Sequence, residues 1–371
     1  MIINVGLRFD HFDPGSEVFK ASLTQGDQSK KPVKDKNYLS PRLGISHPIT
    51  DRSTLYFFYG RFVQIPTLSE LYRRQNRFRV FQNQLNTFGN PDLKAEETIS
   101  YEVGFDHQLT DDLKIGVTGF FKENRNQINL ATFGPEAAPF RMLVNRDFGR
   151  DRGFEIELIK RYSHYFSANI NYTLSWADTR SSTFDRGIGA QGVASFPNVR
   201  EVPADWDQRH TLNANISFEV PAGRGIKLFG TTIDRMGLNT FIRYGSGLPF
   251  TVNEDADPFA TENAERLPYF LTVDLRFRKD FRLYRGLLAS FYVDVNNLFN
   301  RRNLLALVND AEHSCVECTL PVFDPQTGAQ VGTVTKTFKH GNPAGDGTPV
   351  DLNPEQFGAP RQILFGLGMR F

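Results

Sequence analysis

The chain has 371 residues and nearly balanced charge, with 43 Lys and Arg against 42 Asp and Glu, which gives no argument for a nucleic-acid partner. No apolar run approaches the roughly 18 residues of a membrane-spanning helix, so transmembrane helices are excluded. Phe occurs 34 times and Tyr 12 times, and this aromatic content favours a β protein with one apolar and one wet face.

The first predicted element is a strand over residues 2–12. Its side chains alternate, with Ile3 and Val5 on one face and Asn4 on the other, the period of two that marks a strand with unlike faces. The same stretch has neither the basic region nor the apolar core of a secretory signal. We therefore expect no signal peptide, and we interpret residues 1–371 as a single β-structured segment.

The period-two pattern recurs along the whole chain. The alternating segments are roughly 9 to 14 residues long, which is the length of a tilted membrane-spanning strand. Strands of soluble sheets are usually nearer five or six residues. About twelve segments alternate in this way: 2–12, 39–49, 53–63, 96–109, 112–124, 151–161, 164–177, 207–220, 235–247, 267–280, 285–299 and 361–371.

The connections between these segments are alternately short and long. Short turns on one rim and long polar loops on the other are typical of an outer-membrane barrel, whose sheet must close because hydrocarbon offers no hydrogen-bond partner. We therefore predict an all-β, antiparallel, up-and-down transmembrane β-barrel with short periplasmic turns and long extracellular loops. The long loops are predicted at 13–38, 64–95, 125–150, 178–206, 248–266 and 300–360.

Aromatic residues near the predicted strand ends are candidates for the girdles that barrels place at the membrane interface. The alternative for each one is ordinary packing. The residues are Tyr59, Trp176, Tyr244 and Phe299.

The second long loop carries a cluster of arginines within LYRRQNRFRV. Guanidinium groups bind anions in bidentate fashion, so the cluster is a candidate for capturing an anionic ligand or contacting lipopolysaccharide phosphates. The alternative is an ordinary solvated loop. Just before it, IPTLSELY predicts one or two helical turns with Thr67 or Ser69 as cap. The clustered arginines are Arg73, Arg74, Arg77 and Arg79.

The stretch DWDQRH resembles catalytic material because Asp205, Asp207 and His210 cluster in it. It lies where a long loop re-enters a strand, so we favour a charge network in which Asp207, Arg209 and Thr211 share one face. No nucleophile-elbow, phosphate-loop or zinc-helix pattern occurs in the sequence. We therefore expect no enzymatic activity, no cofactor and no catalytic or metal site.

Two cysteines, Cys315 and Cys318, lie in the longest loop. Exported proteins meet an oxidising environment, so a local disulfide between them is the preferred interpretation. A metal site that also uses His313 has too few ligands to be convincing, and a redox pair would need a βαβ context that this sequence lacks.

The chain ends within a predicted strand, QILFGLGMRF. Ile363, Phe365 and Leu367 share one face with the terminal residue Phe371, and small residues such as Gly366 lie on the other. The pattern is that of a closing barrel strand rather than a frayed terminus.

Four stretches together resemble the C-terminal barrel half of TonB-dependent outer-membrane receptors, most closely those that carry a carboxypeptidase-regulatory-like domain. They are GNPDLKAEETISYEVGFD, VPADWDQRHTLNANISF, VDVNNLFNRRN and PRQILFGLGMRF. Each motif is weak alone, and their order and spacing carry the resemblance.

The resemblance implies a barrel of about 22 strands around a plug domain, with a segment that contacts TonB. This chain shows about half of those strands and no recognisable plug, so we expect the barrel portion of a receptor for a large scarce nutrient: a metal chelate, cobalamin, an oligosaccharide or a peptide. Its implied location is the bacterial outer membrane. Its implied partners are outer-membrane lipid and lipopolysaccharide, TonB through the plug only, and the assembly machinery that recognises the terminal aromatic, Phe371.

Two other classes of protein remain open. A plug-less passive pore or structural outer-membrane protein would use the same strands as a self-closed barrel. A soluble β-rich protein would need the apolar faces to pack on each other.

Overall fold

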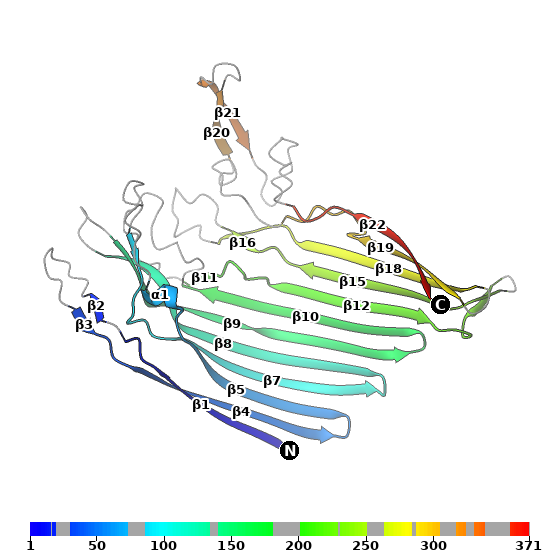
Figure 1. The fold of residues 1–371 in the computed structure, drawn as a ribbon, viewed down its shortest axis with the longest axis horizontal. Helices are drawn as coiled ribbons and strands as arrows, with labels where there is room; N and C mark the ends of the chain where they lie inside the picture. Colours follow the sequence, from blue (N-terminus) through cyan, green and yellow to red (C-terminus); the bar gives the residue numbers. More distant parts are fainter. Residues whose placement is uncertain are drawn as a thin grey trace. The chain divides into compact units, whose positions relative to one another are not determined.

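We describe the protein from a computed structural model. The structure describes residues 1–15, 17–19, 30–72, 86–133, 140–180, 201–228, 231–250, 263–283, 287–304, 317–323, 330–337 and 357–370. These residues are mostly in antiparallel strands, with one short helix, α1 (Leu68–Tyr72), among them (Figure 1). In this part of the chain, no helix is long and apolar enough to cross a membrane.

One sheet contains the long strands, and they pair in the order in which they follow one another in the chain. Figure 1 shows neighbours such as β4 and β5 joined by a short turn. Among the described residues, β1 pairs only with β4 and β22 only with β19. The path runs through β1 (Ile2–Phe12), β4 (Lys36–Thr50), β5 (Ser53–Gln64), β7 (Glu96–Thr110), β8 (Leu113–Phe133), β9 (Phe140–Ser163), β10 (Phe166–Thr179), β12 (His210–Val220), β15 (Met236–Gly245), β18 (Phe270–Arg282), β19 (Leu288–Asn296) and β22 (Gln362–Arg370).

Shorter strands lie in the connections. β6 pairs in parallel with the start of β9, and β11 pairs with the end of β10. The others form small hairpins: β2 with β3, β13 with β14, β16 with β17, and β20 with β21. Their bounds are β2 (Glu17–Phe19), β3 (Lys30–Pro32), β6 (Asn86–Phe88), β11 (Val202–Pro203), β13 (Ile226–Leu228), β14 (Thr231–Ile233), β16 (Pro249–Phe250), β17 (Glu265–Arg266), β20 (Glu317–Phe323) and β21 (Gln330–Thr337).

The predicted strand order is confirmed, and one predicted loop is wrong. Residues 125–150 were expected to form a long loop, yet β8 continues to Phe133 and β9 begins at Phe140. The extension is stabilised by burial, because Leu130 and Leu143 are almost fully covered in a small core with α1. The apolar contacts of this core come from residues far away in the sequence.

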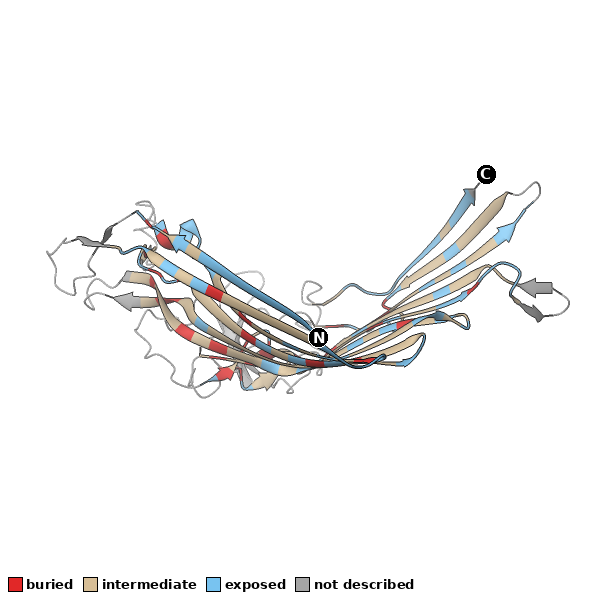
Figure 2. Ribbon diagram, turned by 90° about the horizontal axis from the view of Figure 1, so that it is seen from below, coloured by how far each residue is buried: buried red, intermediate tan, exposed pale blue. Residues whose placement is uncertain are grey.

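Alternation gives the sheet an apolar face and a polar face. On the apolar face of β7, Tyr101, Val103 and Phe105 are 39 to 53% exposed. The edge strands β1 and β22 are exposed along most of their length (Figure 2). Large contiguous apolar surface is rare on soluble proteins, and here it runs along successive strands. The arrangement suits a face that contacts lipid.

The chain divides into two compact units. The first contains Met1–Phe105, Thr118–Gly153 and Trp176–Asp205, and it includes the small core around α1. The second contains Asp106–Val117, Phe154–Ser175 and Trp206–Phe371.

A carboxylate in the second unit ties two neighbouring short turns together. Asp112, in the turn between β7 and β8, accepts hydrogen bonds from the Lys160 ammonium and the Ser163 hydroxyl at the end of β9. It also accepts one from Thr110 Oγ1 at 2.5 Å. These three donors, Lys160 first, hold the pKa of the Asp112 carboxyl far below its ordinary value of 3.8.

We expect Asp112→Asn to lower the urea midpoint for unfolding of the chain in detergent micelles at pH 7. A folded-state pKa below the unfolded value contributes stability that is present above the unfolded pKa and is lost as the pH falls. The difference between wild type and variant should therefore stay constant from pH 7 down to about 5 and shrink as the pH falls below 3.8. Asp51→Asn, in the turn between β4 and β5, is the matched control and should change little. An equal loss for Asp112→Asn at pH 7 and pH 3 would contradict the assignment.

Candidate functional site

The polar face of the second unit carries paired charges. Arg276 donates to both carboxylate oxygens of Asp294 at 2.6 Å, across β18 and β19. Lys114 lies between two acids, 3.3 Å from Asp106 and 3.2 Å from Glu157. Paired charges keep the face hydrated without a strong net field, so it offers both hydrogen-bond donors and acceptors.

Amide side chains continue the same face. Asn239 donates to Asn215 and to Ser217, each at 2.7 Å, and Asn171 donates to Asn169 at 2.8 Å. Such contacts link neighbouring polar side chains along and between strands. The face is therefore a polar wall rather than a core.

Two tyrosines lie flat over glycines on the polar face. A Cβ built on Gly104 would lie 2.2 Å from the Tyr56 ring, and one on Gly366 would lie 2.0 Å from the Tyr292 ring. Only glycine permits this close approach. Tyr56 is also fixed by a 2.5 Å hydrogen bond between its hydroxyl and Thr118 Oγ1. The rings cover the backbone and do not project away from the wall.

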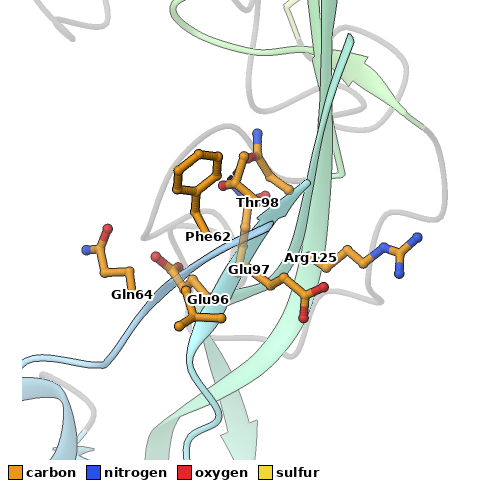
Figure 3. Close-up of a pocket in the computed structure, with 9 residues that line it drawn as sticks. Phe62, Gln64, Glu96, Glu97, Thr98 and Arg125 are labelled. Carbon is orange, nitrogen blue, oxygen red and sulfur yellow. Dashed lines mark hydrogen bonds between the residues drawn. The ribbon is translucent and has the colours of Figure 1, made fainter. Parts of the chain in front are cut away.

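A cavity of about 200 Å³ lies in the first unit, at the loop-side ends of β5, β7 and β8. Figure 3 shows Phe62, Gln64 and Glu96 on one side of the strands and Glu97 and Arg125 on the other. Glu96 Oε1 accepts a hydrogen bond from the Ile128 amide at 2.9 Å. The lining residues are Phe62, Val63, Gln64, Glu96, Glu97, Thr98, Asn124, Arg125 and Gln127.

Hydrogen bonds order the polar side chains around this cavity. Thr98 Oγ1 donates to Asn124 Oδ1 at 2.8 Å, and Asn124 Nδ2 donates to Asp151 at 3.0 Å. A preorganised row of hydroxyl, amide and carboxylate groups can bind a polar solute with little loss of side-chain entropy.

The segment NPDLKAE anchors the second long loop to β9. Asn90 Nδ2 donates to the Leu143 carbonyl at 2.9 Å, and Asn90 Oδ1 accepts from the Asp92 amide at 2.9 Å. Leu93 is fully buried in the small core. Asn145 bonds both the amide and the carbonyl of Lys94, at 2.7 and 2.9 Å. The NPDLKAE segment, which carries part of the family resemblance, therefore has a structural role: it fixes the end of the loop to β9.

The predicted helical turn is confirmed as α1, with Thr67 as its cap. The Thr67 amide donates to Glu70 Oε2 at 2.6 Å, and the Glu70 amide approaches Thr67 Oγ1 at 3.4 Å, which forms a capping box. At the other end of the helix, Tyr72 donates to the Pro14 carbonyl at 2.5 Å. The helix therefore holds two loop bases together.

The stretch DWDQRH forms a second anchor. Asp207 is fully buried and pairs with Arg209 Nε at 2.9 Å and with the Arg266 guanidinium. Arg266 also donates to the Asp207 carbonyl at 2.7 Å. His210 instead hydrogen-bonds Tyr172 at 2.8 Å. The predicted Asp207–Arg209 pair is confirmed, and the sequence interpretation missed Arg266 because it lies 59 residues away.

The stretch NLFNRRN forms a third anchor. Asn297 has a left-handed φ of 52°, which asparagine tolerates, and its amide donates to Asp274 Oδ1 at 2.8 Å. Its side chain donates to the carbonyls of Arg301 and Ala359 at 2.9 and 3.0 Å. Asn303 bonds both the amide and the carbonyl of Leu271 at 2.9 Å. These contacts fix the entry to β22.

Several predicted site residues fall outside the described part of the chain. The arginines Arg73, Arg74, Arg77 and Arg79 do so, as do Cys315, His313 and Phe371. Cys318 lies in β20, and its side chain is also outside the description. Among the described residues, no group of three or more His, Cys, Asp or Glu side chains could hold a metal ion.

Comparison with known proteins gives a family match and similar folds. The family described as "TonB dependent receptor-like, beta-barrel" matches residues 2–298. No curated protein matches the sequence.

Solved structures are similar at low identity. The ferric-catecholate import receptor Fiu from E. coli K12 is 16% identical with a TM-score of 0.50, over 81% of this chain and 38% of that one. The ferric yersiniabactin uptake receptor FyuA from Yersinia pestis is 16% identical with a TM-score of 0.50, over 83% and 40%. FpvA from P. aeruginosa, bound to a heterologous pyoverdine, is 14% identical with a TM-score of 0.51, over 90% and 33%. This chain thus spans less than half of the length of each.

We expect Asp207→Asn to lower the free energy of unfolding by roughly 3 kcal/mol, because it leaves two guanidinium groups facing a neutral amide in a buried site. The comparison is Asp294→Asn, which removes the partner of the exposed Arg276 and should cost much less. Denaturant titration in detergent micelles measures both. Equal losses in the two variants would contradict the role of Asp207 as a buried anchor.

Proposed function

The chain belongs to the TonB dependent receptor-like β-barrel family, and on that premise we propose that it forms the barrel portion of a receptor for active uptake of a large, scarce nutrient. Proteins of this family lie in the bacterial outer membrane, and so does this chain. Passage of the nutrient and energy supplied through TonB belong to the proposal.

The main support is the contrast between the two faces of one sheet. Apolar side chains such as Val103 and Phe105 are exposed on one face, while the polar face carries ion pairs such as Arg276–Asp294. In a membrane barrel, the first face contacts lipid and the second lines an aqueous interior. The paired charges and amides of the polar wall are suited to a hydrated solute.

The cargo class is the finer part of the proposal: a metal chelate, cobalamin, an oligosaccharide or a peptide. The similar structures include receptors for ferric catecholate and ferric yersiniabactin, so iron chelates are the first class to assay. The arginines Arg73, Arg74, Arg77 and Arg79 remain a proposed capture site for an anionic chelate. A Cys315–Cys318 disulfide remains a proposed tie of the longest loop.

The partners follow from the same proposal. TonB would act through a plug domain inside the barrel, and the barrel would supply the path and part of the selectivity. The assembly machinery of the outer membrane would recognise Phe371 on the last strand. We propose no enzymatic step.

A passive pore made from these strands alone is the competing function. Such a pore requires β1 to pair with β22, because an unpaired edge in hydrocarbon leaves N–H and C=O groups without partners. The family match over residues 2–298 favours the receptor over such a pore.

Uptake in the native host separates the two functions. We expect deletion of the gene to abolish accumulation of one labelled cargo class at low concentration, with iron chelates assayed first. Collapse of the inner-membrane proton gradient should give the same loss in the wild type, since TonB-driven work depends on it. Uptake that persists without the gradient would favour the pore, and unchanged uptake of all four classes after deletion would overturn the receptor.

A further inference from the structure

Aromatic side chains form a row on the apolar face of the first unit. The rings of Tyr59 and Tyr101 lie 5.2 Å apart, and those of Tyr101 and Phe121 lie 6.4 Å apart, across β5, β7 and β8. Aromatic rows of this kind mark the level at which a barrel leaves the hydrocarbon. Side chains that lie beyond these rings on the same face, toward the long loops, are therefore at the level of the lipid headgroups.

Arginines on β5, β8 and β9 lie at that position. On β5, Arg61 follows Tyr59 by two residues, and on β8, Arg125 follows Phe121 by four, so alternation keeps each on the apolar face. Arg150 and Arg152 lie on β9 in the same alternation as the exposed Phe154 and Ile156, and thus on the apolar face. Figure 3 shows Arg125 on the side of the strands opposite Phe62 and Glu96. We refer to Arg61, Arg125, Arg150 and Arg152 as the arginine band.

Each arginine of the band is oriented by a carboxylate. The nitrogen–oxygen distances are 2.8 Å for Arg61–Glu97, 2.7 Å for Arg125–Glu123, 3.0 Å for Arg150–Glu201 and 3.3 Å for Arg152–Asp178.

The guanidinium is more exposed than its carboxylate in three of these pairs. The exposed fractions are 33 and 12% for Arg61 and Glu97, 51 and 26% for Arg125 and Glu123, and 52 and 19% for Arg152 and Asp178. In the fourth pair they are equal within a per cent, at 40 and 39% for Arg150 and Glu201. In those three pairs the guanidinium therefore lies farther out than its carboxylate.

The arginines retain donors for a second acceptor. A guanidinium has five N–H donors, and each carboxylate contact here uses one terminal nitrogen. Arg61 also donates to the Leu39 carbonyl at 3.2 Å, and further N–H groups of its guanidinium remain for another acceptor. Guanidinium groups match phosphate oxygens in bidentate geometry, and this match does not require net positive charge on the protein.

We propose that the arginine band binds the phosphate groups of lipopolysaccharide in the outer leaflet. The four cations are spread over three strands of the sheet, which fits a headgroup with several phosphates better than one free ion. The proposal rests on the outer-membrane location of the chain and is independent of the cargo. It also involves other residues than the capture site proposed at Arg73, Arg74, Arg77 and Arg79.

The test uses the protein extracted from native outer membranes in mild detergent, with retained lipopolysaccharide measured per mole of protein. We expect R61Q/R125Q and R150Q/R152Q each to retain less, with binding weakened about fivefold per arginine removed. The matched control is R243Q/R276Q, which removes two arginines with Asp partners from the polar face and should retain the wild-type amount. Equal retention in all variants would overturn the proposal.

A second measurement uses only the wild-type protein and so does not depend on how the variants fold. Protein stripped of lipid is titrated with lipopolysaccharide, with enzymatically dephosphorylated lipopolysaccharide and with inorganic phosphate. Tight binding of the first and weak binding of the other two is the expected result. Equal binding of the dephosphorylated lipid would overturn the role of phosphate, and equal binding by inorganic phosphate would overturn the lipid as ligand.

Uptake of cargo is measured in the same strains, so the two proposals can fail separately. Loss of lipopolysaccharide with normal uptake leaves the receptor function intact. Loss of uptake in the gene deletion says nothing against the band.

Discussion

The pairing of backbone hydrogen bonds determines this architecture. Hydrocarbon offers no partner for an N–H or C=O group, so a segment that crosses it as strand must be paired on both sides. Every long strand from β4 to β19 meets this condition through its two neighbours in the sheet. The same pairing fixes register, because a slip of one residue would turn Val103 toward the polar face and Glu102 toward lipid. Side chains are then free to differ completely between the two faces.

This freedom explains why one strand can carry residues that exclude each other in a soluble core. On β18, Arg276 pairs with Asp294 on the polar face, while its neighbour Phe277 belongs to the apolar face. A soluble sheet would have to bury one of these faces, and burial of unpaired charges costs several kcal/mol. In the barrel neither face needs a protein layer on top of it, since lipid covers one and water the other.

Local periodicity made the strands predictable, and distant contacts made the remainder unpredictable. The alternation is visible within each strand and the cap at Thr67 within IPTLSELY, so both could be inferred from the sequence. The extension of β8 and β9 depends on Leu130 and Leu143, which are buried by Leu71 and Leu93 from another loop. Asp207 was assigned to a charge network, but its second cation, Arg266, is 59 residues away. Neither the burial of these leucines nor the pairing with Arg266 can be inferred from a local sequence pattern.

Where the sheet ends, the asparagines of the loop anchors hydrogen-bond backbone N–H and C=O groups that no neighbouring strand pairs among the described residues. An amide side chain has both a donor and an acceptor, so it can satisfy an N–H and a C=O at once, as a neighbouring strand would. Asn303 does this for Leu271, and Asn145 does it for Lys94. A carboxylate in either place would lack the donor. Because these bonds go to backbone groups, the loop bases can keep their geometry whatever side chains the loops carry.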